Sequence, residues 1–110
     1  MSMIYMNGEF IEDRTPLISH KDCGFTTGIG IFDSMLAHNG TLIHGQEHYD
    51  RIAHDVQTVI GLKLYLSFNK FEETCLTLLE KNKPTHNYVR IRTTVTGGLV
   101  KAPLLPAHTP

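Results

Sequence analysis

Several features that mark common protein classes are missing from this sequence. Its 10 Lys and Arg do not outnumber its 11 Asp and Glu, so the formal net charge is −1, and the basic surplus of a nucleic-acid-binding surface is absent. No apolar run approaches the roughly 18 residues of a membrane-spanning helix. The opening residues, MSMIYMNGEF, have no basic segment followed by an apolar one, as a signal peptide would. We therefore expect no nucleic-acid partner and no membrane association.

Cysteine is also scarce. Cys23 and Cys75 lie far apart in the chain and fit no CxxC pattern. Disulfide frameworks are typical of secreted proteins, and CxxC pairs are typical of redox or metal sites. The sequence therefore predicts two reduced thiols and a cytoplasmic location.

Metal-binding and nucleophile motifs are missing as well. The seven histidines include no HExxH pair and no Cys/His quartet, so we predict no metal site. There is no GxSxG elbow and no P-loop. Gly28-Ile29-Gly30 lacks the third glycine of a dinucleotide fingerprint and precedes a predicted strand, not a helix. These motifs assign no catalytic residue to the chain.

Two Asn-Gly pairs predict two hairpins in the first half of the chain. Asn-Gly accepts the positive φ angles of a type I′ turn, the tightest hairpin connection. Between the hairpins, three glycines and two threonines in residues 21–30 favour a loop whose backbone approaches another part of the molecule. The predicted strand pairs are 4–6 with 9–11, around Asn7-Gly8, and 31–38 with 41–44, around Asn39-Gly40.

Two amphipathic helices are predicted next. Apolar residues recur three and four apart over 46–60, and Gly61 is a plausible stop. The same spacing returns in a second helix, which begins at Ser67 or Asn69. Asn69 with Glu72 resembles a capping box.

The last regular element predicted is a strand over 87–96. Strands and helices are segregated along the chain, which favours an α+β fold with an antiparallel sheet covered on one face by the two helices. The 110 residues are predicted to form one small domain, 1–110. The strand alternates, with Val89, Ile91, Thr93 and Val95 on one face and Tyr88, Arg90, Arg92 and Thr94 on the other.

Three arginines each have two interpretations. Arg51 lies nearly opposite the apolar face of the first helix, as a solvated surface residue does, yet its planar guanidinium could hold a phosphate if a second body packs there. Arg90 and Arg92 share one strand face with Tyr88. That face is either open to solvent or closed by a partner domain or subunit.

Four segments, taken in order, resemble the N-terminal part of a known family. They are IYMNGEF at 4–10, like the family's opening NG hairpin; DCGF to GIGIFD at 22–33, like D-R-G-F-x-x-G-D-G-V-F-E; HNGTL at 38–42, like yNGkl; and EHYDRI at 47–52, like eHldRL. This family is the class IV aminotransferases, the fold-type IV pyridoxal-phosphate enzymes, which include branched-chain aminotransferases, D-amino acid aminotransferases and aminodeoxychorismate lyases. The sequence departs from the family pattern at Cys23, Ile29 and Asp33, where the family usually has Arg, Asp and Glu.

The resemblance implies roles for two residues. Arg51 would contact the phosphate of pyridoxal 5′-phosphate, and Phe32 would line the substrate pocket; His48 is expected to be structural, orienting the start of the helix. In this family the lysine and the carboxylate that carry the chemistry belong to a larger C-terminal domain, and no lysine of this chain matches that lysine. We therefore expect an isolated chain that is inactive, with no catalytic residue of its own and the C-terminal domain absent.

The resemblance also implies a parent enzyme and its rivals. The parent would be a homo-oligomer that transfers an amino group between an amino acid and a 2-oxo acid. The absence after Gly98 of the Arg-x-His pair of D-amino acid aminotransferases makes that activity less favoured. Two alternatives stay open: an aminodeoxychorismate-lyase-like enzyme, which eliminates pyruvate, and a stand-alone association domain without catalysis.

Overall fold

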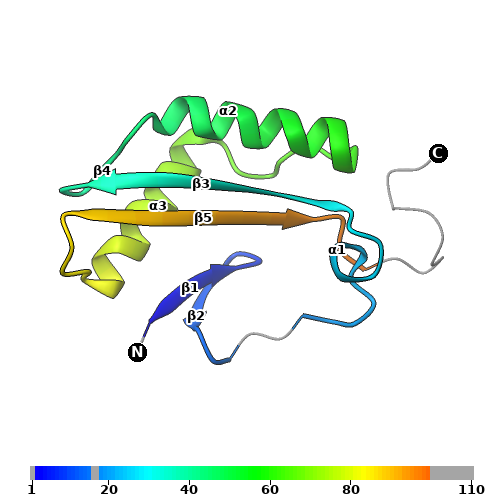
Figure 1. Ribbon diagram of the computed structural model, residues 1–110, viewed down its shortest axis with the longest axis horizontal. Helices are drawn as coiled ribbons and strands as arrows, with labels where there is room; N and C mark the ends of the chain where they lie inside the picture. The colour runs from blue at the N-terminus through cyan, green and yellow to red at the C-terminus, as the bar shows by residue number, and fades with distance from the viewer. Residues whose placement is uncertain (1, 16–17, 100–110) are drawn as a thin grey trace.

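Figure 1 shows the computed structural model of the chain, which describes residues 2–15 and 18–99. A three-stranded antiparallel sheet in the order β4-β3-β5 forms its centre, and β1 and β2 form a separate two-stranded sheet. The elements are β1 (Met3–Met6), β2 (Glu9–Glu12), α1 (Cys23–Thr26), β3 (Gly30–His38), β4 (Thr41–Leu42), α2 (Gly45–Asp55), the π-helix η1 (Val56–Ile60), α3 (Phe68–Asn82) and β5 (Tyr88–Thr96).

Both predicted hairpins form around their Asn-Gly pairs. Asn7 and Gly8 have φ angles of 51° and 92°, and Asn39 and Gly40 have φ angles of 50° and 77°, as a type I′ turn requires. The second hairpin is shorter than predicted, because β4 ends at Leu42 and the chain turns directly into α2.

The long pairing of β3 with β5 runs from Gly30↔Thr96 to His38↔Tyr88. The predicted alternation of β5 is confirmed: its apolar set is partly buried and its set with the arginines is exposed. Asp33, Met35 and Ala37 of β3 are buried on the face that meets the helices. This register fixes which residues of β3 can reach α2.

The predicted α+β class is confirmed. In Figure 1, α2 lies along one side of the β3–β5 pair and α3 crosses behind it, while the β1–β2 hairpin lies on the side of the pair away from α2, where β1 contacts α3. Asn82 at the end of α3 holds this hairpin, since its Oδ1 accepts from Met3 N at 2.6 Å and its Nδ2 donates to Met3 O at 2.9 Å. The buried core joins the sheet to both helices and consists of Met35, Ile52, Val56, Ile60, Phe71 and Cys75.

The helix predicted over 46–60 begins at Gly45 and changes to a π-helix at Val56. Gly61, at a φ of 82°, ends it and donates its N–H to the Val56 carbonyl at 2.9 Å. Val56 and Ile60, four residues apart, share one face of this turn and are both buried in the core.

Ser67, rather than Asn69, caps α3. Its hydroxyl oxygen accepts from Lys70 N at 3.2 Å, so the interpretation of Asn69 with Glu72 as a capping box was wrong. Ser67 has the extended backbone of an N-cap, whereas Asn69 already lies inside the helix.

The segment predicted as a loop, 21–30, contains the one-turn helix α1. Asp22 caps it by accepting from Gly24 N at 2.7 Å. Cys23 N donates to Gly98 O at 2.9 Å, and Gly97 N donates to Ile29 O at 3.2 Å. The prediction of a close backbone approach is confirmed, because this segment packs against the end of β5.

Within 2–15 and 18–99, no helix is long and apolar enough to cross a membrane.

Candidate functional site

A cluster of three polar side chains joins the central sheet to α2. Arg51 and His48, one turn apart on α2, both reach the carboxylate of Asp33 on β3. Arg51 Nη2 lies 2.7 Å and Nε 3.1 Å from Asp33 Oδ1. His48 Nδ1 lies 2.8 Å from Asp33 Oδ2. Both carboxylate oxygens therefore have partners.

The local folding rules explain why these three side chains meet. Residues three apart on a helix lie on the same face, so His48 and Arg51 point the same way. Successive strand side chains alternate between the two faces of a sheet, and Asp33 falls in the same phase as buried Met35 and Ala37. Asp33 consequently points at α2, where its carboxylate meets the two basic side chains.

Burial makes the Asp33 carboxylate dependent on these partners. Its side chain is 5% exposed, against 18% for His48 and 60% for Arg51. A buried carboxylate is stable only when it is paired and hydrogen-bonded. In this cluster the negative charge of Asp33 is buried, whereas the positive charge of Arg51 is partly exposed to solvent.

The Arg51 guanidinium presents unused donors to solvent. Its Nε–H and one Nη2–H are directed at Asp33, and among the described residues its Nη1 has no hydrogen-bond partner. The end of a guanidinium can form two parallel bonds with a phosphate or carboxylate. This end of Arg51 could therefore hold an anionic group.

The sequence indicated Arg51 as a candidate phosphate ligand, but it did not predict the hydrogen bonds between Arg51 and Asp33. Asp33 was noted only as a departure from a family pattern. The available signal was the alternation of β3, because a carboxylate in the buried phase of a strand needs a buried partner. His48, expected to orient the helix start, instead reaches across to the sheet.

Phe32 lies on the other face of β3, adjacent to Asp33 in sequence but pointing away from α2. Its side chain is on the exposed face, with the Arg92 guanidinium carbon 4.3 Å from the ring centroid. On the same face, His38 stacks on Tyr88 at 4.3 Å between ring centroids. Phe32 and Arg51, the two residues singled out from the sequence, thus lie on opposite sides of β3.

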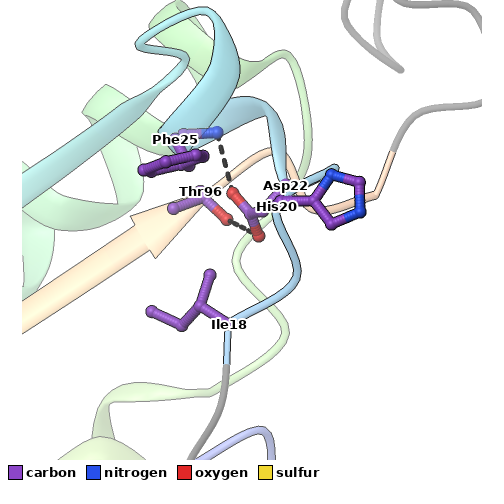
Figure 2. Close-up of a pocket in the computed structure, with 6 residues that line it drawn as sticks. Ile18, His20, Asp22, Phe25 and Thr96 are labelled. Carbon is purple, nitrogen blue, oxygen red and sulfur yellow. Dashed lines mark hydrogen bonds between the residues drawn. The ribbon is translucent and has the colours of Figure 1, made fainter.

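A pocket of about 460 Å³ opens near α1, and neither Phe32 nor Arg51 lines it. Figure 2 shows the Asp22 carboxylate joined to Gly24 N at 2.7 Å and to the Thr96 hydroxyl, which donates at 2.9 Å. Both oxygens of this carboxylate are occupied by the fold itself. The wall is otherwise largely apolar, with Ile18 and Phe25, so the pocket offers little chemistry of its own.

A second hollow of about 470 Å³ lies between the β3–β4 turn and the end of α3. Neither Arg51 nor Phe32 lines it.

Within the described ranges, no group of three His, Cys, Asp or Glu residues is placed to hold a metal ion.

Both cysteines are buried and free. Burial, with a smaller contribution from the nearby Glu72 carboxylate, raises the pKa of Cys75 from 9.0 to about 11. The thiolate is the reactive form of cysteine, so Cys75 is an inert core residue.

The sequence model of the amino-transferase class IV family matches residues 30–108. A D-alanine aminotransferase from Staphylococcus aureus (strain MSSA476) is 31% identical over 94 residues, covering 86% of this chain and 33% of that protein. The chain therefore spans about a third of the length of the curated relatives it matches.

Solved structures share the fold. The branched-chain amino acid aminotransferase from Escherichia coli superposes with a TM-score of 0.80 at 21% identity, covering 96% of this chain and 37% of that one. The branched-chain amino acid aminotransferase from T.th., complexed with N-(5′-phosphopyridoxyl)-L-glutamate, gives a TM-score of 0.77 at 20% identity, covering 92% and 34%. At these identities the likeness concerns the fold.

Proposed function

The chain belongs to the class IV aminotransferase family, and on that premise we propose that it forms the small domain of a pyridoxal-phosphate-dependent aminotransferase. The proposed reaction transfers an amino group between an amino acid and a 2-oxo acid. The relative named D-alanine aminotransferase and the fold shared with branched-chain aminotransferases support this proposal.

The observation that carries the proposal is the outward-facing guanidinium of Arg51. Its Nε and Nη2 are held by a buried carboxylate, its side chain is 60% exposed, and its Nη1 has no hydrogen-bond partner among the described residues. A phosphate offers the paired oxygens that this end of a guanidinium binds best. The residues present therefore fit the phosphate of pyridoxal 5′-phosphate, and we assign Arg51 to it.

When bound, the cofactor supplies an electron-accepting ring that stabilises negative charge on the substrate. The contribution of this chain is to bind and orient. Arg51 would fix the phosphate, and Phe32 would line the substrate pocket from the exposed face of β3, where its ring lies beside Arg92. That face, with Tyr88 and Leu36 also exposed, would be closed by another domain or subunit.

We propose that the lysine and the carboxylate of the reaction lie outside these 110 residues, because no lysine here corresponds to the family's lysine. The chain alone is then inactive, and the working enzyme is a homo-oligomer. A cytoplasmic location is supported by two buried cysteines that remain free thiols.

The phosphate assignment can be tested by 31P NMR of pyridoxal 5′-phosphate titrated with the 110-residue chain. Wild type should shift the phosphate resonance in a saturable way, and Arg51→Gln should abolish that shift. Arg90→Gln is the matched control, since it removes the same charge from the opposite face of the sheet. Equal shifts with wild type and Arg51→Gln would reject the assignment.

Borohydride reduction in the presence of the cofactor tests whether the chain carries the reactive lysine. We expect no stoichiometric lysine adduct, and a single trapped lysine would show that the chain holds more of the site than proposed. Activity assays of the chain together with a lysine-bearing domain separate the aminotransferase from the lyase. An aminotransferase transfers the amino group of D-alanine or of L-branched-chain amino acids, whereas a lyase eliminates pyruvate from aminodeoxychorismate. Absence of any such domain would favour the stand-alone association domain.

A further inference from the structure

The Asp33 carboxylate divides its two oxygens between two residues of α2. Oδ1 accepts from Arg51 Nε and Nη2 at 3.1 and 2.7 Å, and Oδ2 lies 2.8 Å from His48 Nδ1. With its side chain 5% exposed, Asp33 has little access to solvent as a replacement partner. Each of these bonds is therefore needed to keep the carboxylate satisfied.

His48 Nδ1 has two close neighbours but can make only one kind of bond. It lies 2.9 Å from Arg51 Nη2, a donor, and 2.8 Å from Asp33 Oδ2, an acceptor. A ring nitrogen carries either a proton or a lone pair. The buried Oδ2 has only lone pairs, so the network is satisfied when His48 Nδ1 carries a proton and donates to Asp33.

With the proton on His48 Nδ1, only some of the N–H donors of the Arg51 guanidinium are engaged. The guanidinium has five N–H donors, of which one on Nε and one on Nη2 point at Asp33 Oδ1. Because Nδ1–H does not accept, the second Nη2–H is released, and both Nη1 hydrogens remain. The inner edge of the guanidinium, formed by Nε–H and one Nη2–H, is bonded to Asp33. The outer edge, formed by Nη1 and the second Nη2–H, keeps a pair of donors for another group.

We infer that Asp33 and His48 are positioning residues for Arg51: they fix its guanidinium on the inner edge so that the outer edge is held ready for a phosphate group. The inference deepens the proposed function and rests on it for the identity of the anion. Anchoring matters because a free arginine loses considerable rotamer freedom when it binds. Here that freedom is already lost in the folded chain.

The direction in which Asp33→Asn changes phosphate affinity distinguishes a positioning role of Asp33 from a purely electrostatic effect of its charge. Asp33→Asn removes a negative charge next to the anion site, so Coulomb's law alone predicts tighter phosphate binding. Positioning predicts weaker binding, because Arg51 is no longer anchored. Asp50→Asn is the matched control: it removes a carboxylate from the same helix, where Asp50 is exposed and accepts from Gln46 Nε2 at 2.8 Å.

The experiment is an NMR titration of the 15N-labelled full chain with inorganic phosphate, following the Nε–H signal of Arg51. In wild type this proton should exchange slowly with water, and phosphate should shift its signal saturably. Asp33→Asn should speed the exchange and weaken phosphate binding by about 3- to 10-fold. Asp50→Asn should change neither, and Asp33→Glu should restore part of both.

His48 provides a second pair of variants that does not alter the buried carboxylate. Asn places an N–H donor near the Nδ1 position, whereas Leu places none, so His48→Asn should keep slow exchange and His48→Leu should lose it. If Asp33→Asn does not fold, the difference in Arg51 Nε–H exchange between His48→Asn and His48→Leu tests the positioning role instead.

Unchanged Arg51 exchange in both Asp33→Asn and His48→Leu would overturn the inference, as would tighter phosphate binding by Asp33→Asn. If Arg51→Gln binds phosphate as well as wild type, the proposed phosphate site fails instead. The exchange measurements made without phosphate then still decide whether Asp33 and His48 hold Arg51.

Discussion

The Asp33–Arg51 ion pair should contribute measurably to stability, because one of its members is buried. In Arg51→Gln, the carboxylate of Asp33, with a side chain 5% exposed, keeps only its bond from His48 Nδ1 at 2.8 Å. Breaking a fully buried ion pair costs about 3–5 kcal/mol. Arg51 is itself 60% exposed, so solvent screening and the remaining His48 bond reduce the expected loss to roughly 1–2 kcal/mol.

Urea unfolding at neutral pH, followed by circular dichroism, measures this loss, and in thermal unfolding Tm should fall by roughly 4–16 °C. Arg90→Gln, on the exposed face of β5, should stay within about 0.5 kcal/mol of wild type. The double variant Asp33→Asn/Arg51→Gln should lose less than the sum of the two single variants, because the pair is coupled. An Arg51→Gln variant as stable as Arg90→Gln would refute the reasoning and mean that the pair does not hold in solution.

Two further predictions concern the helices. Burial raises the pKa of Cys75 from 9.0 to about 11, so the folded state retains a proton that the unfolded chain releases; stability should be full below about pH 9 and decline by roughly 2–3 kcal/mol toward pH 11. Urea titrations across this range should show that slope in wild type and not in Cys75→Ala; the same slope in both would assign it to another group. Ser67→Ala should destabilise the fold by about 1 kcal/mol, whereas Asn69→Ala, inside α3, should cost nothing or stabilise slightly; equal losses in thermal unfolding would contradict Ser67 as the cap.

Local rules predicted most of the fold. The Asn-Gly pairs fixed both hairpins because few residues accept two successive positive φ angles. Period-two alternation placed the faces of β5 correctly, and period-three-and-four spacing located α2 and α3. The boundaries were less predictable. Ser67 and Asn69 are both good N-cap residues, and only the path of the preceding chain decides between them.

The site was less predictable than the fold because its bonds are non-local. Arg51 lies on the solvent side of its helical wheel, where periodicity favours a free surface residue, and only the family resemblance suggested a binding role. Its bond to Asp33 spans two elements whose relative placement the sequence does not encode locally. The separation of Phe32 from Arg51 by the plane of the sheet likewise follows from the register of β3, which becomes informative once α2 is known to cover one face.

The charge on the cluster explains why this chain should bind phosphate weakly even with Arg51 held in place. Arg51 contributes +1 and Asp33 −1, so the cluster sums to zero, or to +1 when His48 is protonated on both nitrogens. A phosphate monoester carries about −1.5 to −2 at neutral pH. Asp33 therefore improves the geometry of Arg51 while lowering its attraction for an anion, which is useful when other groups supply the remaining positive charge. Binding to the 110-residue chain should accordingly be specific to Arg51 but weak, and a domain that adds further donors should strengthen it by more than its own contacts alone, because Arg51 is already ordered.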